Sequence, residues 1–302
     1  ALLDAPSASV GRVILVSDGL DEEGADAAPV ARRRGGRAGV SALGVGLDFD
    51  EAYLARLALA GRGRFAFVED GASLGELLRR ELSRAGATAL RDGRVTLELP
   101  PGVRFVSAAG FEVEAGPEVC AGHDVEARGG REVTVRLGDL AAGEEHRVLV
   151  ELEAHLAVGA RAAIRARLTG EAGEELREIR SAVQVLVGTG DPQLLREEDG
   201  DVRARGASVR ASLQHLRART LAADGDHGGA EALLAETLAE VRRAQAAAPA
   251  DVAKTLGAQA ATLEGALGAA RAPSTGTARA AAKRALEADA ENITGPGFGA
   301  RR

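Results

Sequence analysis

The sequence predicts a partial doubly wound α/β sheet, followed by an antiparallel β-sandwich and then a C-terminal helical region. Two changes in the spacing of apolar residues indicate this order. Strands and helices alternate at first, apolar residues then recur at every second position, and a helical spacing follows. We therefore expect four segments, with a disordered tail at the end: 1–88, 89–190, 191–294 and 295–302.

The first segment alternates short apolar strands with amphipathic helices. Residues 12–17 read Arg-Val-Ile-Leu-Val-Ser, a run that is typical of a parallel strand covered by helices on both faces. Asp50 can cap the helix after the second strand, and Gly61 can end that helix. The expected order is strand 12–17, helix 26–34, strand 40–46, helix 51–60, strand 64–68 and helix 73–87.

The second and third segments are predicted in the same way. Alternating apolar residues such as Val95, Leu97 and Leu99 indicate half-buried antiparallel strands. Four further runs of this kind and the turns between them predict a β-sandwich. Beyond it we expect helices at 200–223, 229–247 and 250–270, and a shorter one that ends near Asn292. The first two helices are expected to pair as a hairpin.

Composition excludes several classes of partner. A formal net charge of -7 argues against a nucleic-acid or anionic-membrane partner, because both favour a basic surface. Cys120 is the single cysteine, so the chain can form no internal disulfide and lacks a zinc-site pattern. No apolar run approaches the roughly 20 residues that a transmembrane helix needs. The cellular compartment stays undecided.

The first residue is Ala1, and the 302 residues contain no methionine. This predicts a chain that was processed or that is a fragment of a longer protein.

The strongest local signal for a binding site is Asp18. It follows the strand 12–17 directly and is itself followed by Gly19. Ligand sites in open α/β sheets lie at the carboxyl ends of strands, and a carboxylate there can bind Mg²⁺. The alternative is that Asp18 only caps the following loop.

A longer run of residues resembles the second half of a bacterial von Willebrand factor A (VWA) domain. The likeness extends over residues 10–87 and rests on their order and spacing. The residues that carry it are Arg12-Val13-Ile14-Leu15-Val16-Ser17-Asp18-Gly19, Val40-Ser41-Ala42-Leu43-Gly44-Val45-Gly46-Leu47-Asp48-Phe49-Asp50, Leu54, Leu57-Ala58 and Gly61-Arg62-Gly63-Arg64-Phe65.

The resemblance implies a Rossmann-like sheet whose metal-ion-dependent adhesion site uses three loops. These carry an Asp-x-Ser-x-Ser motif, a Thr, and the Asp of an Asp-Gly pair. Only the last matches this sequence, at Asp18; the segment from Asp4 to Ser9 has one residue too many before its serines. We therefore expect a VWA domain truncated at its N-terminus, with too few ligands to bind Mg²⁺ by itself.

The family implies a protein-binding module that is not an enzyme. Its parent protein would bind an unidentified protein partner through Mg²⁺. Truncation would also leave the strand 12–17 with an unpaired apolar edge, so aggregation or pairing with another chain is expected.

Two other functions stay open. An α/β hydrolase could use Asp18 with Glu69 and Asp70, which follow the third strand. A purely structural assembly module would need no metal. The remaining candidates are expected to have packing, turn or solvated roles: the glycines Gly44, Gly46, Gly61 and Gly63, the loop Asp224 to His227, and the scattered His123, His146, His155, His215 and His227.

Overall fold

The computed structural model describes residues 11–17, 27–34, 38–115, 118–120, 132–144, 146–173, 175–191, 199–271 and 276–294. Asp18 and the tail 295–302 lie outside these residues. The chain forms two compact units. The sandwich unit contains the described residues of 85–144 and 148–191, and the α/β–helical unit contains those of 12–84 and 199–294.

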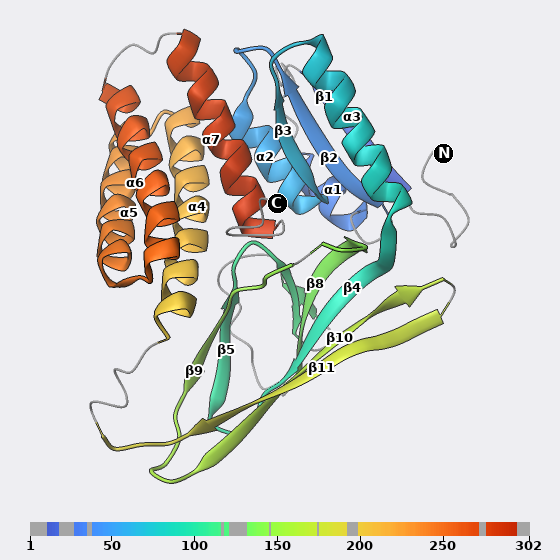
Figure 1. The fold of residues 1–302 in the computed structure, drawn as a ribbon, viewed down its shortest axis with the longest axis vertical. Coiled ribbons are helices and arrows are strands. Elements are labelled where there is room, and N and C mark those ends of the chain that lie inside the picture. Colours follow the sequence, from blue (N-terminus) through green and yellow to red (C-terminus); the bar gives the residue numbers. More distant parts are fainter. Residues whose placement is uncertain are drawn as a thin grey trace. The chain divides into compact units, whose positions relative to one another are not determined.

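The α/β–helical unit matches the predicted elements closely (Figure 1). The helix after the second strand and the first C-terminal helix have the predicted bounds. The elements are β1 (Gly11–Ser17), α1 (Ala28–Arg34), β2 (Ala38–Val45), α2 (Glu51–Ala60), β3 (Arg62–Val68), α3 (Gly71–Gly86), α4 (Gly200–Ala223), α5 (His227–Ala247), α6 (Ala250–Arg271) and α7 (Gly276–Thr294).

The sheet of this unit has the order β1-β2-β3, and β2 and β3 run parallel. Among the described strands, β1 has a neighbour on one side only. Leu15 and Val16 in β1 are exposed. The apolar edge that was predicted for this strand is therefore present in the described part of the chain.

Alternation along β2 explains how the sheet buries both faces. Val40 and Ala42 pack toward α2, whereas Leu43 packs with α3. Gly44 leaves room for the ring of Phe49, because a Cβ there would lie 2.4 Å from a ring carbon. The predicted packing role of this glycine is confirmed, and the doubly wound arrangement follows from burial on both faces.

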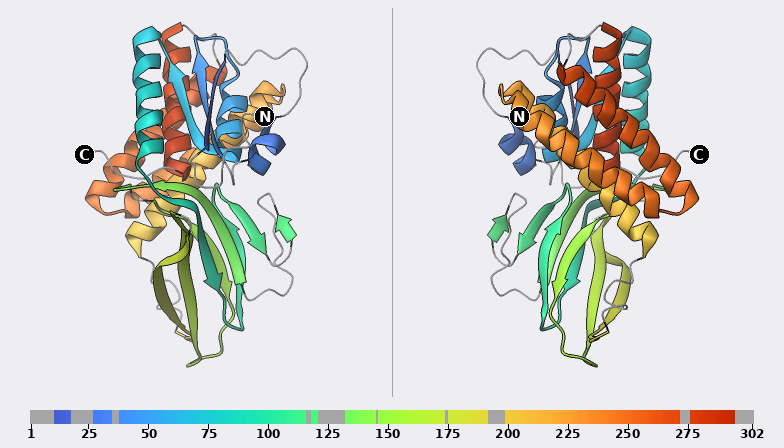
Figure 2. Two further views of the ribbon diagram at one scale, coloured as in Figure 1. Left: turned by 90° about the vertical axis from the view of Figure 1, so that its right-hand side faces the viewer. Right: turned by 90° about the vertical axis from the view of Figure 1, so that its left-hand side faces the viewer.

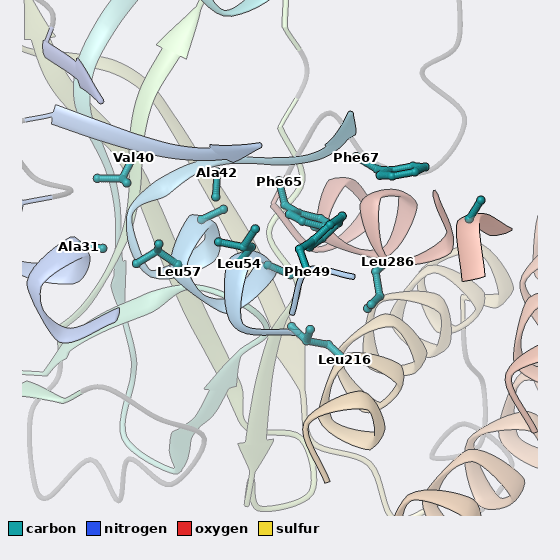
Figure 3. Close-up of a cluster of buried hydrophobic side chains, with 14 residues drawn as sticks. Ala31, Val40, Ala42, Phe49, Leu54, Leu57, Phe65, Phe67, Leu216 and Leu286 are labelled. Atoms are coloured by element: carbon teal, nitrogen blue, oxygen red, sulfur yellow. The ribbon is translucent and has the colours of Figure 1, made fainter. Parts of the chain in front are cut away.

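The C-terminal helices complete the core of the α/β sheet. Leu216 from α4 and Leu286 from α7 belong to the same buried cluster as Phe49, Leu54 and Phe65 (Figure 3). The segments 1–88 and 191–294, which were expected to be separate, thus contribute to one compact unit. No pattern in the sequence predicts this, because the spacing of an amphipathic helix shows only that the helix has an apolar side.

The first two C-terminal helices, α4 and α5, pack against each other, and α6 packs on them (Figure 2). Their shared core is made of small and aliphatic side chains, including Leu234, Val241 and Leu256. The predicted helical hairpin is confirmed.

The sandwich unit contains a larger and a smaller sheet. The strands are β4 (Thr88–Glu98), β5 (Val103–Ala108), β6 (Glu112–Ala115), β7 (Glu118–Cys120), β8 (Glu132–Ala141), β9 (Val150–Ala154), β10 (Arg161–Ala172) and β11 (Glu175–Val187). One sheet has the order β11-β10-β4-β8-β6-β7, and the other pairs β5 with β9. Phe105 of β5 is buried with Val133 and Val135 of β8, which confirms the predicted packing of two antiparallel sheets.

Removal of the Leu286 side chain tests whether α7 is part of the core of the α/β sheet. Leu286 is 1% exposed in that core, so we expect Leu286→Ala to lower the free energy of unfolding by about 2 to 5 kcal/mol. The matched control is Leu82→Ala on α3, where Leu82 is 67% exposed, and its effect should stay within about 0.5 kcal/mol. Urea denaturation measures both; equal effects would show that α7 does not belong to this core.

Candidate functional site at the strand ends

The candidate site is the edge of the sheet where β2 and β3 end. Gly46 to Asp50 follow β2, and Glu69 and Asp70 follow β3. The amide of Gly46 donates to the carbonyl of Val68 at 3.3 Å, so the two strand ends are adjacent. Asp18, the predicted metal ligand, lies outside the described residues.

Two carboxylates at this edge cap helices. Asp50 accepts a hydrogen bond from the amide of Tyr53 at 2.9 Å and is the N-cap of α2, as predicted. Asp70 accepts from the amide of Ser73 at 2.8 Å and from its hydroxyl at 2.6 Å. These bonds to Ser73 lower the pKa of Asp70, because they stabilise the carboxylate. Both side chains therefore have local structural roles.

Two other carboxylates pair with arginines of α7. Asp48 binds Arg279, which also donates to the carbonyl of Leu47 at 2.7 Å. Glu69 binds Arg284. Glu69 and Asp70, the residues that the hydrolase alternative requires, are thus engaged in an ion pair and a helix cap.

Lys283 of α7 is the centre of the contact between this helix and the strand ends. Its side chain is 4% exposed. Its ammonium donates to the carbonyl of Phe49 at 3.0 Å and to Glu51 at 2.9 Å, and lies 3.6 Å from the centre of the Phe49 ring. Each polar contact partly replaces the water that burial removes.

Burial nevertheless makes the charged form of Lys283 less favourable. Desolvation, together with the nearby cations Arg219 and Arg279, lowers the pKa of Lys283 from 10.5 to about 8. The carboxylates of Asp48 and Asp50 oppose this change only partly. Because Lys283 is buried only when α7 is docked, its protonation is coupled to the docking of this helix.

Additional polar contacts attach the C-terminal helices to α2 and β3. Arg219 of α4 also binds Glu51. Arg64 of β3 binds Glu291 of α7 at 2.5 Å, and the amide of Phe67 donates to Glu287 at 3.5 Å. Desolvation raises the pKa of Glu287.

Sequence reasoning missed this row of charged residues on α7. A signal was available, because the chain has only two lysines, and Arg279, Lys283, Glu287 and Glu291 recur at every fourth position of a helix. Such a row is usually solvated, so its spacing alone could not indicate burial.

A buried polar network lies between α4, α6 and α7. His215 binds Asp289 at 2.6 Å, with side-chain exposures of 3% and 9%. Solvated or interfacial histidines were expected; His155 is exposed, and His215 is buried where α4 meets α7. A separate set of amide and hydroxyl groups on the same three helices is also hydrogen-bonded, and these residues are Ser208, Ser212, Gln259 and Asn292. Ser212 is 0% exposed, so the network is suited to holding helices together and not to reaching a substrate.

The described carboxylates do not fit a Mg²⁺ site. Asp48 and Glu69 bind arginines, while Asp50 and Asp70 cap helices. No group of three or more His, Cys, Asp or Glu residues suited to a metal occurs in the described ranges. Asp224 and Asp226 mark a turn, as predicted, with Asp226 capping α5. In the part of the chain that the structure describes, no helix has the length and apolar character needed to cross a bilayer.

Comparison with solved structures identifies the fold. A von Willebrand factor type A protein from Catenulispora acidiphila is similar over 97% of this chain and 67% of its own, with a TM-score of 0.63 and 18% identity. The α/β part of this chain is a VWA-like domain. The predicted resemblance is thereby confirmed at the level of the fold, and the chain spans about two thirds of that protein.

Two other similar structures are more distant. Human COPII-coat protein Sec24c has a TM-score of 0.50 and 15% identity, over 92% of this chain and 40% of that one. The ArnB paralog VWA2 from Sulfolobus acidocaldarius has a TM-score of 0.44 and 14% identity, over 92% of this chain and 63% of that one. No protein-family model and no curated protein sequence matches.

The lowered pKa of Lys283 predicts a pH dependence of the stability of this VWA-like unit. Between pH 8 and 10.5 the unfolded chain binds more protons at this position than the folded chain, so the contribution of Lys283 to stability rises with pH. We expect the free energy of unfolding of the wild type to rise across this range relative to Lys283→Met, by up to a few kcal/mol.

Urea denaturation at several pH values measures this difference. The matched control is Lys254→Met, because Lys254 is exposed on α6 and should give no such trend. Parallel pH profiles for the wild type and Lys283→Met would contradict the assignment.

Proposed function

We propose that this chain is the scaffold of a protein-binding VWA module and has no catalytic role. Its parent protein would bind a protein partner through a Mg²⁺-dependent site to which Asp18 contributes. The observation that carries the proposal is the VWA-like fold, in which the strand ends face the C-terminal helix α7.

The chemistry at the strand ends supports a binding role over hydrolysis. A hydrolase would need at least two acidic or basic groups free to act on a substrate. Asp70 caps α3 and Glu69 pairs with Arg284, so both are committed to the fold. The metal-free assembly module that the sequence left open also agrees with these contacts, and metal binding separates the two.

Mg²⁺ itself is expected to bind this chain poorly. Asp18 supplies one carboxylate, whereas Mg²⁺ takes six oxygen ligands, commonly one or two carboxylates together with waters and other oxygens. The sequence contains no Asp-x-Ser-x-Ser motif that would supplement it. The ligand set that this chain offers is therefore incomplete under our proposal.

Calorimetric titration with Mg²⁺ tests the metal site. We expect no saturable binding to this chain, and about one Mg²⁺ bound by the natural protein that contains it. In the natural protein, Asp18→Ala should abolish binding and Asp224→Ala, in the turn between α4 and α5, should retain it.

Two results would contradict the proposal in different ways. Saturable binding to this chain that Asp18→Ala removes would mean that its ligand set is sufficient. Absence of binding to the natural protein, or binding that survives Asp18→Ala, would remove Mg²⁺ from the function and favour the metal-free assembly module.

A further inference from the structure

The last strand of the sandwich unit, β11, forms an exposed edge. It has 13 residues, and β10 is its only neighbour among the described strands (Figure 1). Every residue of β11 except Leu186 is exposed. Large apolar side chains of β11 that are at least half exposed are Leu176, Ile179, Val183, Val185 and Val187.

The three valines lie on one face of the sheet. Leu186, between two of them, packs against the core of the sandwich. Since successive residues of a strand point to opposite faces, Val183, Val185 and Val187 point outward. On the neighbouring strand they oppose Arg165, Ala163 and Arg161. Among the described residues, the outer face of β11 therefore presents a row of half-exposed valines.

Charged side chains occur only in the first half of β11, residues 175–180. Residues 175–180 carry Glu175, Arg177, Glu178 and Arg180, and such charges normally discourage pairing with another strand. Residues 181–187 read Ser-Ala-Val-Gln-Val-Leu-Val and contain neither a charge nor a proline. An edge segment that is apolar, extended and uncharged is suited to accept a further strand.

The pattern of this segment is self-complementary. Val183 and Val187 are equally spaced around Val185, so an antiparallel copy places valine opposite valine along the outer face.

We propose that two copies of this chain pair through β11 in antiparallel register, with Val185 on the two-fold axis. Val183 of each copy faces Val187 of the other, and the six-stranded sheets join into one. One strand from each copy makes a small interface, so the dimer is reversible and depends on concentration. The pairing goes beyond the proposed function and does not involve the strand ends of the VWA-like domain.

The first experiment is sedimentation velocity of the full chain over a range of concentrations. We expect a monomer–dimer equilibrium that Val185→Lys shifts to monomer, because two ammonium groups would face each other on the axis. The matched control is Val158→Lys in the same unit, where Val158 is 76% exposed, and it should dimerise like the wild type. Circular dichroism of each variant establishes that it is folded.

Cysteine cross-linking tests the register. In a Cys120→Ser background, Val185→Cys should form a disulfide-linked dimer under mild oxidation, whereas Val183→Cys alone should not. A mixture of Val183→Cys and Val187→Cys copies should cross-link, since these positions face each other.

Three outcomes would overturn the proposal: a monomer at every concentration, a dimer that survives Val185→Lys, or efficient self-cross-linking of Val183→Cys. A surviving dimer would indicate pairing elsewhere, for example through the exposed edge of β1. If β11 instead binds a different extended polypeptide, the chain by itself would sediment as a monomer at every concentration.

Discussion

The docking of α7 onto Phe49 and its neighbours is the interaction on which the α/β–helical unit depends. The Phe49 ring occupies the space above Gly44, packs edge-on against Phe65, and lies under the ammonium of Lys283. A buried ammonium needs polar partners, and the carbonyl of Phe49 and the carboxylate of Glu51 provide them. Those partners exist only when α7 and the start of α2 are both in place, so the helical region and the sheet stabilise each other.

This constraint also shapes the candidate site. Arginines of α7 neutralise Asp48 and Glu69 at the strand ends, which is the region where an open α/β sheet usually binds its ligand. The carboxylates described at this edge therefore serve the fold, and Asp18, the one predicted metal ligand, lies outside the described residues. The binding function that we propose then depends on groups other than those that hold α7.

Much of the fold could be predicted because buried apolar residues recur along the sequence with the period of the strand or helix that contains them. The short β-branched apolar run of β1, the alternation in β4 and the helical spacing of α5 each indicated the type of element that the structure contains. The strands β5, β6 and β7 were not predicted; β6 and β7 have only four and three residues, which are too few to show a period. The site was less predictable, because the charges of α7 look like those of any solvated helix.

The sequence by itself determined the order of the elements and the VWA-like character of the α/β part, because these depend on local spacing and residue type. Only the tertiary structure decided that α7 closes against the strand ends, that His215 and Lys283 are buried, and that β11 is an exposed edge. These properties depend on which elements meet in space. Contacts between residues more than 200 positions apart, such as Phe49 and Lys283, produce no periodic pattern in the sequence.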